Sequence, residues 1–336
     1  MNSDAPAIVE PLPDMGSSFE SVNYGLRPNK TVERRLIFDT LTQLSGPMKL
    51  SEYRYLGLGA ILFVDFVLAH RGLGIDDLVS IEYESNAARA QKNAPFGCIK
   101  VLPGDASVVL VNGSIDLGSK RTIAWMDYDG EADATTIGDL EVLCTNLPVG
   151  SVILATVNAV RANYKSDEAA ANLGDSLKKT FGALAPDPLP KKADSMNGFP
   201  PVIAEILMTH CIRVVQKSRS SEISFVPLFD FVYKDGTSPM VTIGGIITDQ
   251  ATREIVSGLP TAGMFTSLSS QPVELDLPIL TPRERLILDR LLPSQGVLNP
   301  ETIKDALGFS MRPSLTESYR RLYKFYPTFT ETHCVS

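Results

Sequence analysis

Short apolar segments alternate with amphipathic segments through the first half of the chain. Segments with the apolar spacing of a helix lie at 60–71, 85–92 and 135–147. Between and around them, five apolar runs have the length and composition of buried strands, at 53–58, 78–82, 98–102, 122–126 and 151–157. Because strands that alternate with helices join through right-handed crossovers, the pattern predicts an α/β fold with a parallel sheet covered on both faces.

The regions on either side of this alternation have a different character. Residues 1–20 are rich in proline, serine and acidic side chains, so we expect a mobile tail there. Residues 21–50 predict a loop followed by a helix over 31–44, whose leucine and isoleucine side chains share one face. After a predicted helix at 201–217, two β-rich runs flank a Lys-Asp-Gly-Thr turn at 234–237, which is typical of an antiparallel hairpin.

The C-terminal part of the chain changes to helical patterns. A Thr-Pro-Arg-Glu sequence at 281–284 is a typical helix start, with threonine as N-cap and proline in the first turn. Three short helices are predicted here, over 281–292, 299–307 and 314–323. We therefore predict a sheet domain over 51–250 and a helical appendage over 251–336.

Composition and charge narrow the class of protein. The 336 residues are 44% hydrophobic and 21% charged, as in ordinary globular proteins of one or two domains. A net charge of −8 does not favour a mainly electrostatic nucleic-acid binder. The four cysteines are widely spaced without a CxxC pair, which indicates reduced thiols in a cytoplasmic protein and no structural zinc site. The most apolar run, 55–69, contains Asp65 and is too short to cross a membrane.

A glycine loop and an acid follow the first two predicted strands. Gly57 and Gly59 form a Gly-x-Gly sequence between a strand and a helix, where a backbone can approach a ligand closely. Glu82 ends the second strand, 23 residues after Gly59 (82 minus 59), at a spacing that suits a bond to ribose hydroxyls. The alternative for the Gly-x-Gly sequence is a tight turn between strand and helix, and the alternative for Glu82 is a solvated acid in a loop.

Further acids follow the third and fourth predicted strands. Asp105, with Ala106 after it, could bind an adenine amino group or could instead form an Asx turn or helix N-cap. Asp127 and Asp129 come at the carboxyl end of a parallel strand, where α/β proteins bind ligands. They are candidates for a base or for metal ligands, and a turn with hydrogen-bonding aspartates is the alternative.

The order of these four features resembles that of class I S-adenosylmethionine-dependent methyltransferases over about residues 50–250. The resemblance implies a seven-stranded, Rossmann-like, mostly parallel sheet with an antiparallel C-terminal hairpin, and it implies S-adenosylmethionine as cofactor. Carried over residue by residue, the cofactor site comprises Gly57, Gly59, Glu82, Asp105 and Asp127, with Ala106 beside Asp105. The segments 24–30 and 55–70 also look like bacterial proteins loosely labelled O-methyltransferases.

The sequence departs from the family pattern at several positions. Tyr55 and Ile61 stand where the family usually has an acid and a third glycine, and Asp65 could replace that acid at the amino group of the cofactor. Metal-dependent O-methyltransferases combine Asp-x-Asp with a later Asp-Asn, whereas this chain has Val157-Asn158 there. We therefore predict no metal.

The functional prediction is a methyltransferase that acts on a hydroxyl or an amine, with Asp127 and Asp129 as catalytic residues. Tyr24, Arg27 and Lys30 would cover the cofactor or hold the substrate, or would belong to a solvated helix face. A non-catalytic sensor that binds S-adenosylmethionine or a nucleotide on the same fold is the alternative. The appendage could serve a homodimer or substrate recognition, and these possibilities stay open.

Overall fold

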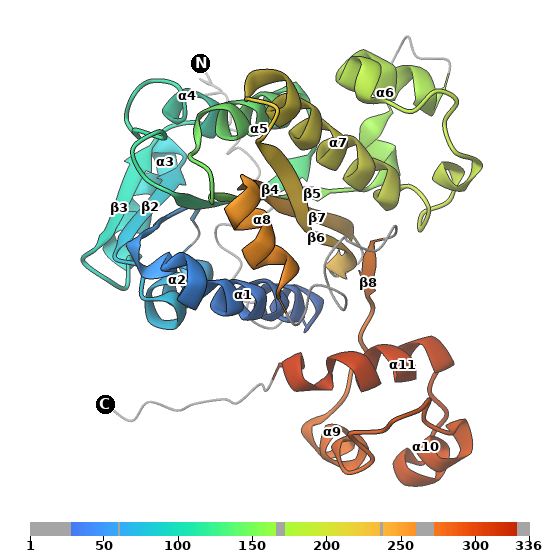
Figure 1. Ribbon diagram of the computed structural model, residues 1–336. Coiled ribbons are helices and arrows are strands. Elements are labelled where there is room, and N and C mark those ends of the chain that lie inside the picture. Colours follow the sequence, from blue (N-terminus) through green and yellow to red (C-terminus); the bar gives the residue numbers. More distant parts are fainter. Residues whose placement is uncertain (1–27, 60, 166–171, 236–237, 260–271, 328–336) are drawn as a thin grey trace, which may run out of the picture.

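One eight-stranded sheet organises the part of the chain that the structure describes, which is residues 28–59, 61–165, 172–235, 238–259 and 272–327 (Figure 1). The structure is a computed structural model. Its strands follow the order β3-β2-β1-β4-β5-β7-β6-β8. They are β1 Arg54–Leu58, β2 Asp77–Glu82, β3 Ile99–Pro103, β4 Thr122–Glu131, β5 Val152–Asn158, β6 Ser224–Asp235, β7 Ser238–Thr248 and β8 Val273–Leu275. The tail predicted at 1–20 lies outside the described residues.

The predicted mixture of parallel and antiparallel pairing is confirmed. Strands β1 to β5 pair in parallel, and β1 lies in the middle, with Leu56 opposite Val79 on β2 and Ala124 on β4. Strand β7 runs antiparallel between β5 and β6, which completes the predicted hairpin. The central strands are buried on both faces, which explains their nearly continuous apolar sequences.

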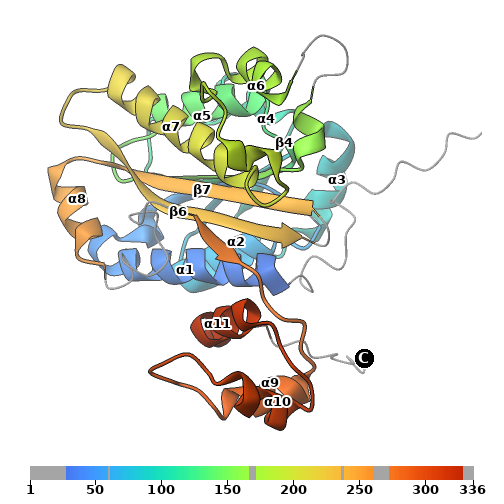
Figure 2. The same cartoon turned by 90° about the vertical axis from the view of Figure 1, so that its right-hand side faces the viewer.

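Helices cover both faces of the sheet (Figure 2). On one face lie α1 Pro28–Met48, α2 Val64–Leu73, α3 Glu84–Asn93 and α8 Gln250–Ser257. On the other face lie α4 Ala106–Val109, α5 Ala134–Asn146, α6 Leu173–Phe181 and α7 Pro200–Ser218. Each face has its own buried apolar cluster, and successive residues of β4 contribute to different clusters, Trp125 to the first and Met126 to the second.

The start of α2, the end of β4 and the number of strands differ from the sequence prediction. Helix α2 begins at Val64 rather than directly after Gly59, because Phe63 adopts a left-handed backbone conformation with φ of 48°. Strand β4 continues to Glu131, five residues beyond the predicted end at 126 (131 minus 126), since its pairing with β5 is resumed between Glu131 and Asn158. The sheet has eight strands rather than seven, because β8 pairs in parallel with β6.

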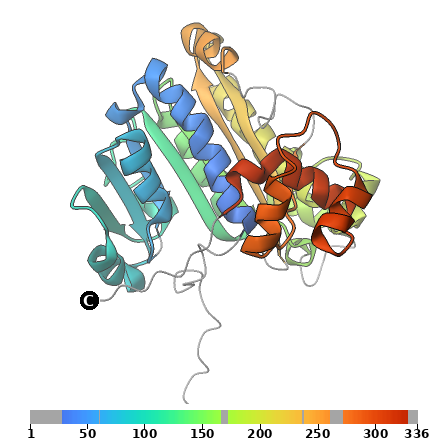
Figure 3. The same cartoon turned by 90° about the horizontal axis from the view of Figure 1, so that it is seen from below.

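The C-terminal helices form a small separate layer beside α1 (Figures 1 and 3). They are α9 Pro282–Asp289, α10 Pro300–Leu307 and α11 Pro313–Leu322. Thr281 caps α9 as predicted, in a capping box with Glu284. The Arg35 guanidinium of α1 donates hydrogen bonds of 3.0 Å to the carbonyls of Phe325 and Tyr326, and so fixes the end of the appendage to α1. Since α8 and β8 pack with the sheet domain, the purely helical part begins at α9 rather than at 251.

Among the described residues, no helix combines the length and the apolar character that crossing a membrane would require. The longest helix, α1, instead carries several buried charged side chains that contact the sheet domain.

Gly245 of β7 allows the hairpin to pack closely. A Cβ atom at this position would lie 2.6 Å from the carbonyl oxygen of Val226 and would also overlap the ring of Phe225. We expect Gly245→Ala to lower the free energy of unfolding by about 1–3 kcal/mol, because a backbone atom cannot rotate away from the clash. Urea denaturation followed by circular dichroism measures the change.

The matched control is Gly138→Ala in the middle of α5, where a new Cβ would meet no atom within 4 Å. This variant should gain about 0.5–1 kcal/mol from the higher helix propensity of alanine. Equal stability of the two variants would contradict the packing argument.

Candidate functional site

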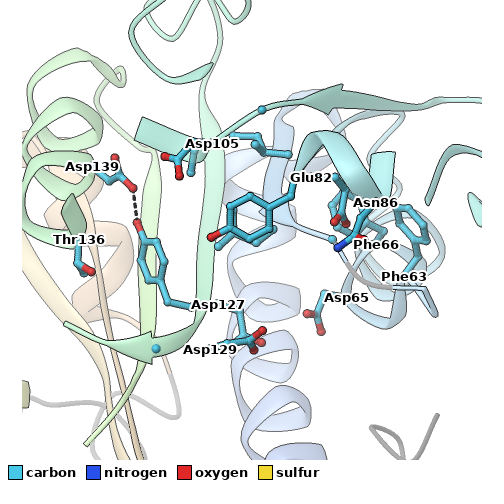
Figure 4. A pocket seen from close by; sticks show the side chains of 18 of the residues that line it. Phe63, Asp65, Phe66, Glu82, Asn86, Asp105, Asp127, Asp129, Thr136 and Asp139 are labelled. Atoms are coloured by element: carbon cyan, nitrogen blue, oxygen red, sulfur yellow. Dashed lines mark hydrogen bonds between the residues drawn. The ribbon is translucent and has the colours of Figure 1, made fainter. Parts of the chain in front are cut away.

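A cavity of about 400 Å³ lies at the carboxyl ends of β1, β2, β3 and β4 (Figure 4). The first turn of α2, the start of α5 and one side chain of α1 complete its wall. Ligands of α/β proteins bind at this edge of the sheet. The cavity brings together seven of the predicted site residues, namely Gly59, Asp65, Glu82, Asp105, Ala106, Asp127 and Asp129.

Glu82 ends β2 with an almost completely buried carboxyl group, at 5% exposure of the residue. Its Oε1 atom accepts no hydrogen bond of good geometry from the described residues. Burial, with a smaller contribution from the Asp129 charge, raises the pKa of Glu82 to about 7, against the lowering effect of a hydrogen bond from Ser80. A buried acceptor of this kind is costly unless a ligand donates to it.

Gly59 makes the position of Glu82 possible. A Cβ atom on Gly59 would overlap both Ser80 Oγ and Glu82 Oε1. The glycine therefore leaves room for a carboxylate, in addition to the ligand approach that the sequence predicts. Gly57 lies further back within β1 and does not line the cavity; a Cβ there would meet the carbonyl oxygen of Trp125 at 3.3 Å.

Asp105 forms the helix N-cap that was one of its two predicted alternatives, and it also lies at the cavity. It is the N-cap of α4, with its Oδ1 accepting hydrogen bonds from the Ser107 amide at 2.9 Å and the Ser107 hydroxyl at 2.6 Å. It also lines the cavity with Ala106. The cap fixes the direction of the carboxyl group, which is a property useful for recognising a ligand.

The extended end of β4 presents acids and a tyrosine to different sides of the cavity. Alternation along a strand places Asp127 and Asp129 on one side, where Figure 4 shows them together, and it places Tyr128 on the other side. Asp127 is largely shielded, whereas Asp129 is exposed. Asp127 and Asp129 therefore lie on one face of β4, and they do not form the aspartate turn that was the alternative prediction.

Asp127 is held by a buried ammonium group from α1. Lys30 Nζ lies 2.9 Å from Asp127 Oδ1 and 3.1 Å from Glu33 Oε2, and Lys30 is only 2% exposed. The same ammonium lies 5.0 Å from the centre of the Trp125 ring. Burial raises the pKa of Glu33, the Lys30 charge opposes this, and the Asp127 charge adds to it. Lys30 thus contacts the predicted catalytic acid from within the protein rather than covering the cavity.

Buried hydroxyl groups extend this network across the sheet. Glu33 accepts a hydrogen bond from Thr242 of β7, whose hydroxyl lies 2.7 Å from that of Thr156 on β5. Thr156 in turn accepts a 3.0 Å hydrogen bond from Trp125 Nε1. These contacts fix the register of α1 against β4, β5 and β7.

A second ion pair joins α1 to α2 at the edge of the cavity. Arg34, one turn after Lys30, pairs with Asp65 in the first turn of α2. Both residues line the cavity, and Arg34 is the one lysine or arginine among the described lining residues. Tyr24 and Arg27, the other two predicted covering residues, lie outside the described residues.

Tyr128 and Asp139 form a pair that sequence reasoning missed. Tyr128 Oη donates a 2.7 Å hydrogen bond to Asp139 Oδ2, drawn in Figure 4. Burial raises the pKa of Asp139 to about 6 despite this hydrogen bond, with smaller increases from the charges of Asp105 and Asp133. Burial likewise raises the pKa of the Tyr128 phenol. No local sequence pattern predicts this pair, because Tyr128 is on strand β4 and Asp139 is on helix α5.

Tyr83 and Asn86 also line the cavity without having been predicted. Tyr83 directly follows Glu82 and is 66% exposed, which is unusual for a large aromatic side chain. Its position next to the strand-ending acid is a signal that the sequence contained. Asn86 follows on the first turn of α3 and gave no such signal.

The comparisons with known proteins agree with this arrangement. The model of a family described as "Putative O-methyltransferase" matches residues 22–334. No curated protein matches the sequence. The chain belongs to this methyltransferase family, and its sheet order and cavity are those of a Rossmann-like, class I S-adenosylmethionine-dependent methyltransferase.

Several solved structures resemble parts of the chain at low identity. Trm1 from Pyrococcus horikoshii with S-adenosyl-L-methionine is 12% identical, with 89% of this chain and 76% of that chain covered and a TM-score of 0.45. The plantazolicin methyltransferase BamL is 15% identical, with 68% and 90% covered and a TM-score of 0.39. PigF with SAH is 12% identical, with 64% of this chain covered and a TM-score of 0.30, and the chain spans 63% of its length.

The Lys30 ammonium should be essential for stability because it is buried and pairs with both Asp127 and Glu33. We expect Lys30→Met to lower the free energy of unfolding at neutral pH by about 3–5 kcal/mol, since Asp127 and Glu33 would then face each other without a cation. The double variant Lys30→Met/Glu33→Gln should recover part of the loss, because one of the two charges is removed. Urea denaturation of both variants measures the difference.

Lys92→Met, on the exposed side of α3, is the control and should change the stability by less than about 0.5 kcal/mol. The network argument is wrong if Lys30→Met is as stable as this control, or if the double variant is less stable than Lys30→Met.

Proposed function

We propose that this chain transfers the methyl group of S-adenosylmethionine to a hydroxyl group of a neutral or cationic acceptor in the described cavity. The observation that carries the proposal is Glu82, a buried carboxyl at the end of a parallel strand whose Oε1 atom lacks a donor of good geometry. Hydroxyl groups of a ribose are suitable donors for such an acceptor. Family membership supports the cofactor and the oxygen acceptor.

The residues that line the cavity fit the chemical groups of this cofactor. Glu82 would accept hydrogen bonds from the ribose, and Asp105 would accept one from the adenine amino group. The exposed Tyr83 ring would stack on the adenine. Arg34 and Asp65 would bind the carboxylate and the ammonium of the methionine end, respectively.

The acids of β4 supply the remaining requirement, which is proton removal from the acceptor. When bound, the cofactor provides an electrophilic methyl group on a sulfonium. Asp129, exposed at the cavity, would accept the hydroxyl proton of the acceptor, whereas Asp127, paired with Lys30, would orient that hydroxyl. Most of the catalysis then comes from the placement of acceptor and methyl group.

The charges of the cavity restrict the acceptor. Eight carboxyl groups line it, and the single arginine is already paired with one of them. An anionic acceptor would be repelled, so we expect a neutral or cationic hydroxyl compound. Family membership does not favour the non-catalytic alternative. An amine acceptor, a homodimer and a cytoplasmic location stay predictions.

The pH dependence of cofactor binding tests the site. The ribose would bind the ionised form of Glu82, whose pKa is about 7 in the free protein. Affinity should therefore rise as the pH increases through about 7, and below it should fall by up to about tenfold per pH unit, because binding first requires loss of the proton. Calorimetric titration with S-adenosylmethionine and its demethylated product between about pH 6 and pH 8 measures this.

Glu82→Gln should bind about tenfold or more weakly at the upper end of this range and lose the pH dependence. Glu84→Gln, on the exposed first turn of α3 outside the cavity, should bind as the unmodified protein does. Unchanged affinity in Glu82→Gln would refute the assignment of Glu82, and binding of neither compound to the unmodified protein would refute the cofactor.

Activity is tested with a panel of hydroxyl compounds of different charge, by following the demethylated cofactor. Neutral and cationic acceptors should react in preference to anionic ones. Asp129→Asn should reduce the rate roughly 10²-fold, because it removes the base, and should leave cofactor affinity within about twofold. Glu141→Gln, exposed on α5 away from the cavity, is the control. Preference for anionic acceptors or an unaffected rate in Asp129→Asn would contradict the proposal.

A further inference from the structure

A group of three potential metal ligands lies at the edge of the sheet opposite the cavity. His70 is in the last turn of α2, Asp76 directly precedes β2, and Cys98 directly precedes β3. Because these segments precede parallel strands, they lie at the amino ends of the strands, whereas the cavity lies at the carboxyl ends. One ligand atom from each residue lies within 4.8 Å of the others. The group is therefore separate from the methyltransferase site.

Nδ1 of His70 is at the centre of the group. It lies 3.1 Å from Asp76 Oδ1, 3.9 Å from Cys98 Sγ and 2.9 Å from the carbonyl oxygen of Ile75. A single proton on Nδ1 can be directed at only one of these acceptors at a time. A cation in the space between them could bind the imidazole, the carboxylate and the sulfur together.

The two separations that involve His70 Nδ1 are close to those of a small tetrahedral site, and the Asp76 and Cys98 ligand atoms lie within 4.8 Å of each other. Zinc bonds of about 2.0 Å to nitrogen and oxygen and about 2.3 Å to sulfur give ligand separations of about 3.3–3.6 Å in a tetrahedron. The observed 3.1 Å and 3.9 Å need adjustments of only a few tenths of an ångström. Asp76 is 81% exposed and can move by this amount without disturbing the core.

The surroundings hold the imidazole ring in position. The ring of Phe96 packs against that of His70, with the centroids 4.3 Å apart. Gly74 ends α2 in a left-handed conformation, and its amide bonds to the carbonyls of Ala69 and His70. The packing against Phe96 limits rotation of the imidazole ring, and the Gly74 cap fixes the end of the helix that carries it.

Contrary to the sequence prediction of no metal, we propose that His70 Nδ1, Asp76 Oδ1 and Cys98 Sγ, which only the fold brings together, bind a zinc ion with water as the fourth ligand. The mixture of nitrogen, oxygen and sulfur suits zinc, and it does not suit magnesium or calcium, which prefer oxygen ligands. Binding converts the Cys98 thiol to a thiolate and releases its proton to solvent, and the neutral imidazole keeps its proton on Nε2. No electron is transferred. The ion would connect α2 to the starts of β2 and β3.

Cobalt is the spectroscopic probe for this site because a thiolate–cobalt bond absorbs in the near ultraviolet. The full chain, freed of metal with a chelator, is titrated with Co²⁺ and then with Zn²⁺. We expect one equivalent of Co²⁺ to produce the charge-transfer band and Zn²⁺ to abolish it. Cys98→Ser should remove the band, and Asp76→Asn should weaken binding at least tenfold.

Two controls separate the site from other thiols and acids. Cys334→Ser removes a cysteine elsewhere in the sequence, and Asp305→Asn removes an exposed acid on α10. Both should bind Co²⁺ as the unmodified protein does. The exposed position of Asp76 ensures that its variant folds, which circular dichroism verifies. Absence of the band in the unmodified protein, its persistence in Cys98→Ser, or unchanged affinity in Asp76→Asn would each overturn the proposal.

Discussion

The arrangement of the whole site depends on one buried ammonium group, that of Lys30 between Asp127 and Glu33. An ion in such a place is tolerated only when it is fully paired, so the register of α1 against the sheet is fixed by charge as well as by apolar packing. Arg34 follows four residues later on the same face and pairs with Asp65 of α2. Two successive turns of α1 therefore position acids on two elements of the cavity wall, as the course of α1 along the sheet in Figure 3 illustrates.

On the other wall of the cavity, the position of Glu82 depends on Gly59, which has no side chain. Gly59 leaves a space that Glu82 and Ser80 occupy, and burial there keeps the pKa of Glu82 far above that of an ordinary carboxyl. Strand β4 lies between the two walls and, by alternation, sends Asp127 and Asp129 to one side and Tyr128 to the other. The acids of the cavity thus have different environments: Asp127 is paired with Lys30, Glu82 is buried with a raised pKa, and Asp129 is exposed.

The sequence predicted the parallel strands, the hairpin and the helical appendage from apolar periodicity, because periodicity reports directly which faces are buried. It placed Glu82 at the end of β2 and Asp105 just after β3 correctly, whereas Asp127 lies within β4 rather than after it. It missed the continuation of β4, since Asp-Tyr-Asp-Gly has weak strand propensity and only the pairing with β5 holds it extended. Strand β8, three residues long, has no periodicity to detect, and its place is set by β6.

The sequence by itself determined the order of the elements, the class of sheet and the edge at which the ligand-binding acids gather. These three features follow from the spacing of apolar residues along the chain and from the rule that the carboxyl ends of parallel strands lie at one edge of the sheet. Only the tertiary structure decided which charges meet. Lys30 and Asp127 are 97 residues apart and His70 and Cys98 are 28 apart, and no local pattern encodes such a contact. The partners of these residues come from elements that meet only when the sheet and its helices have assembled.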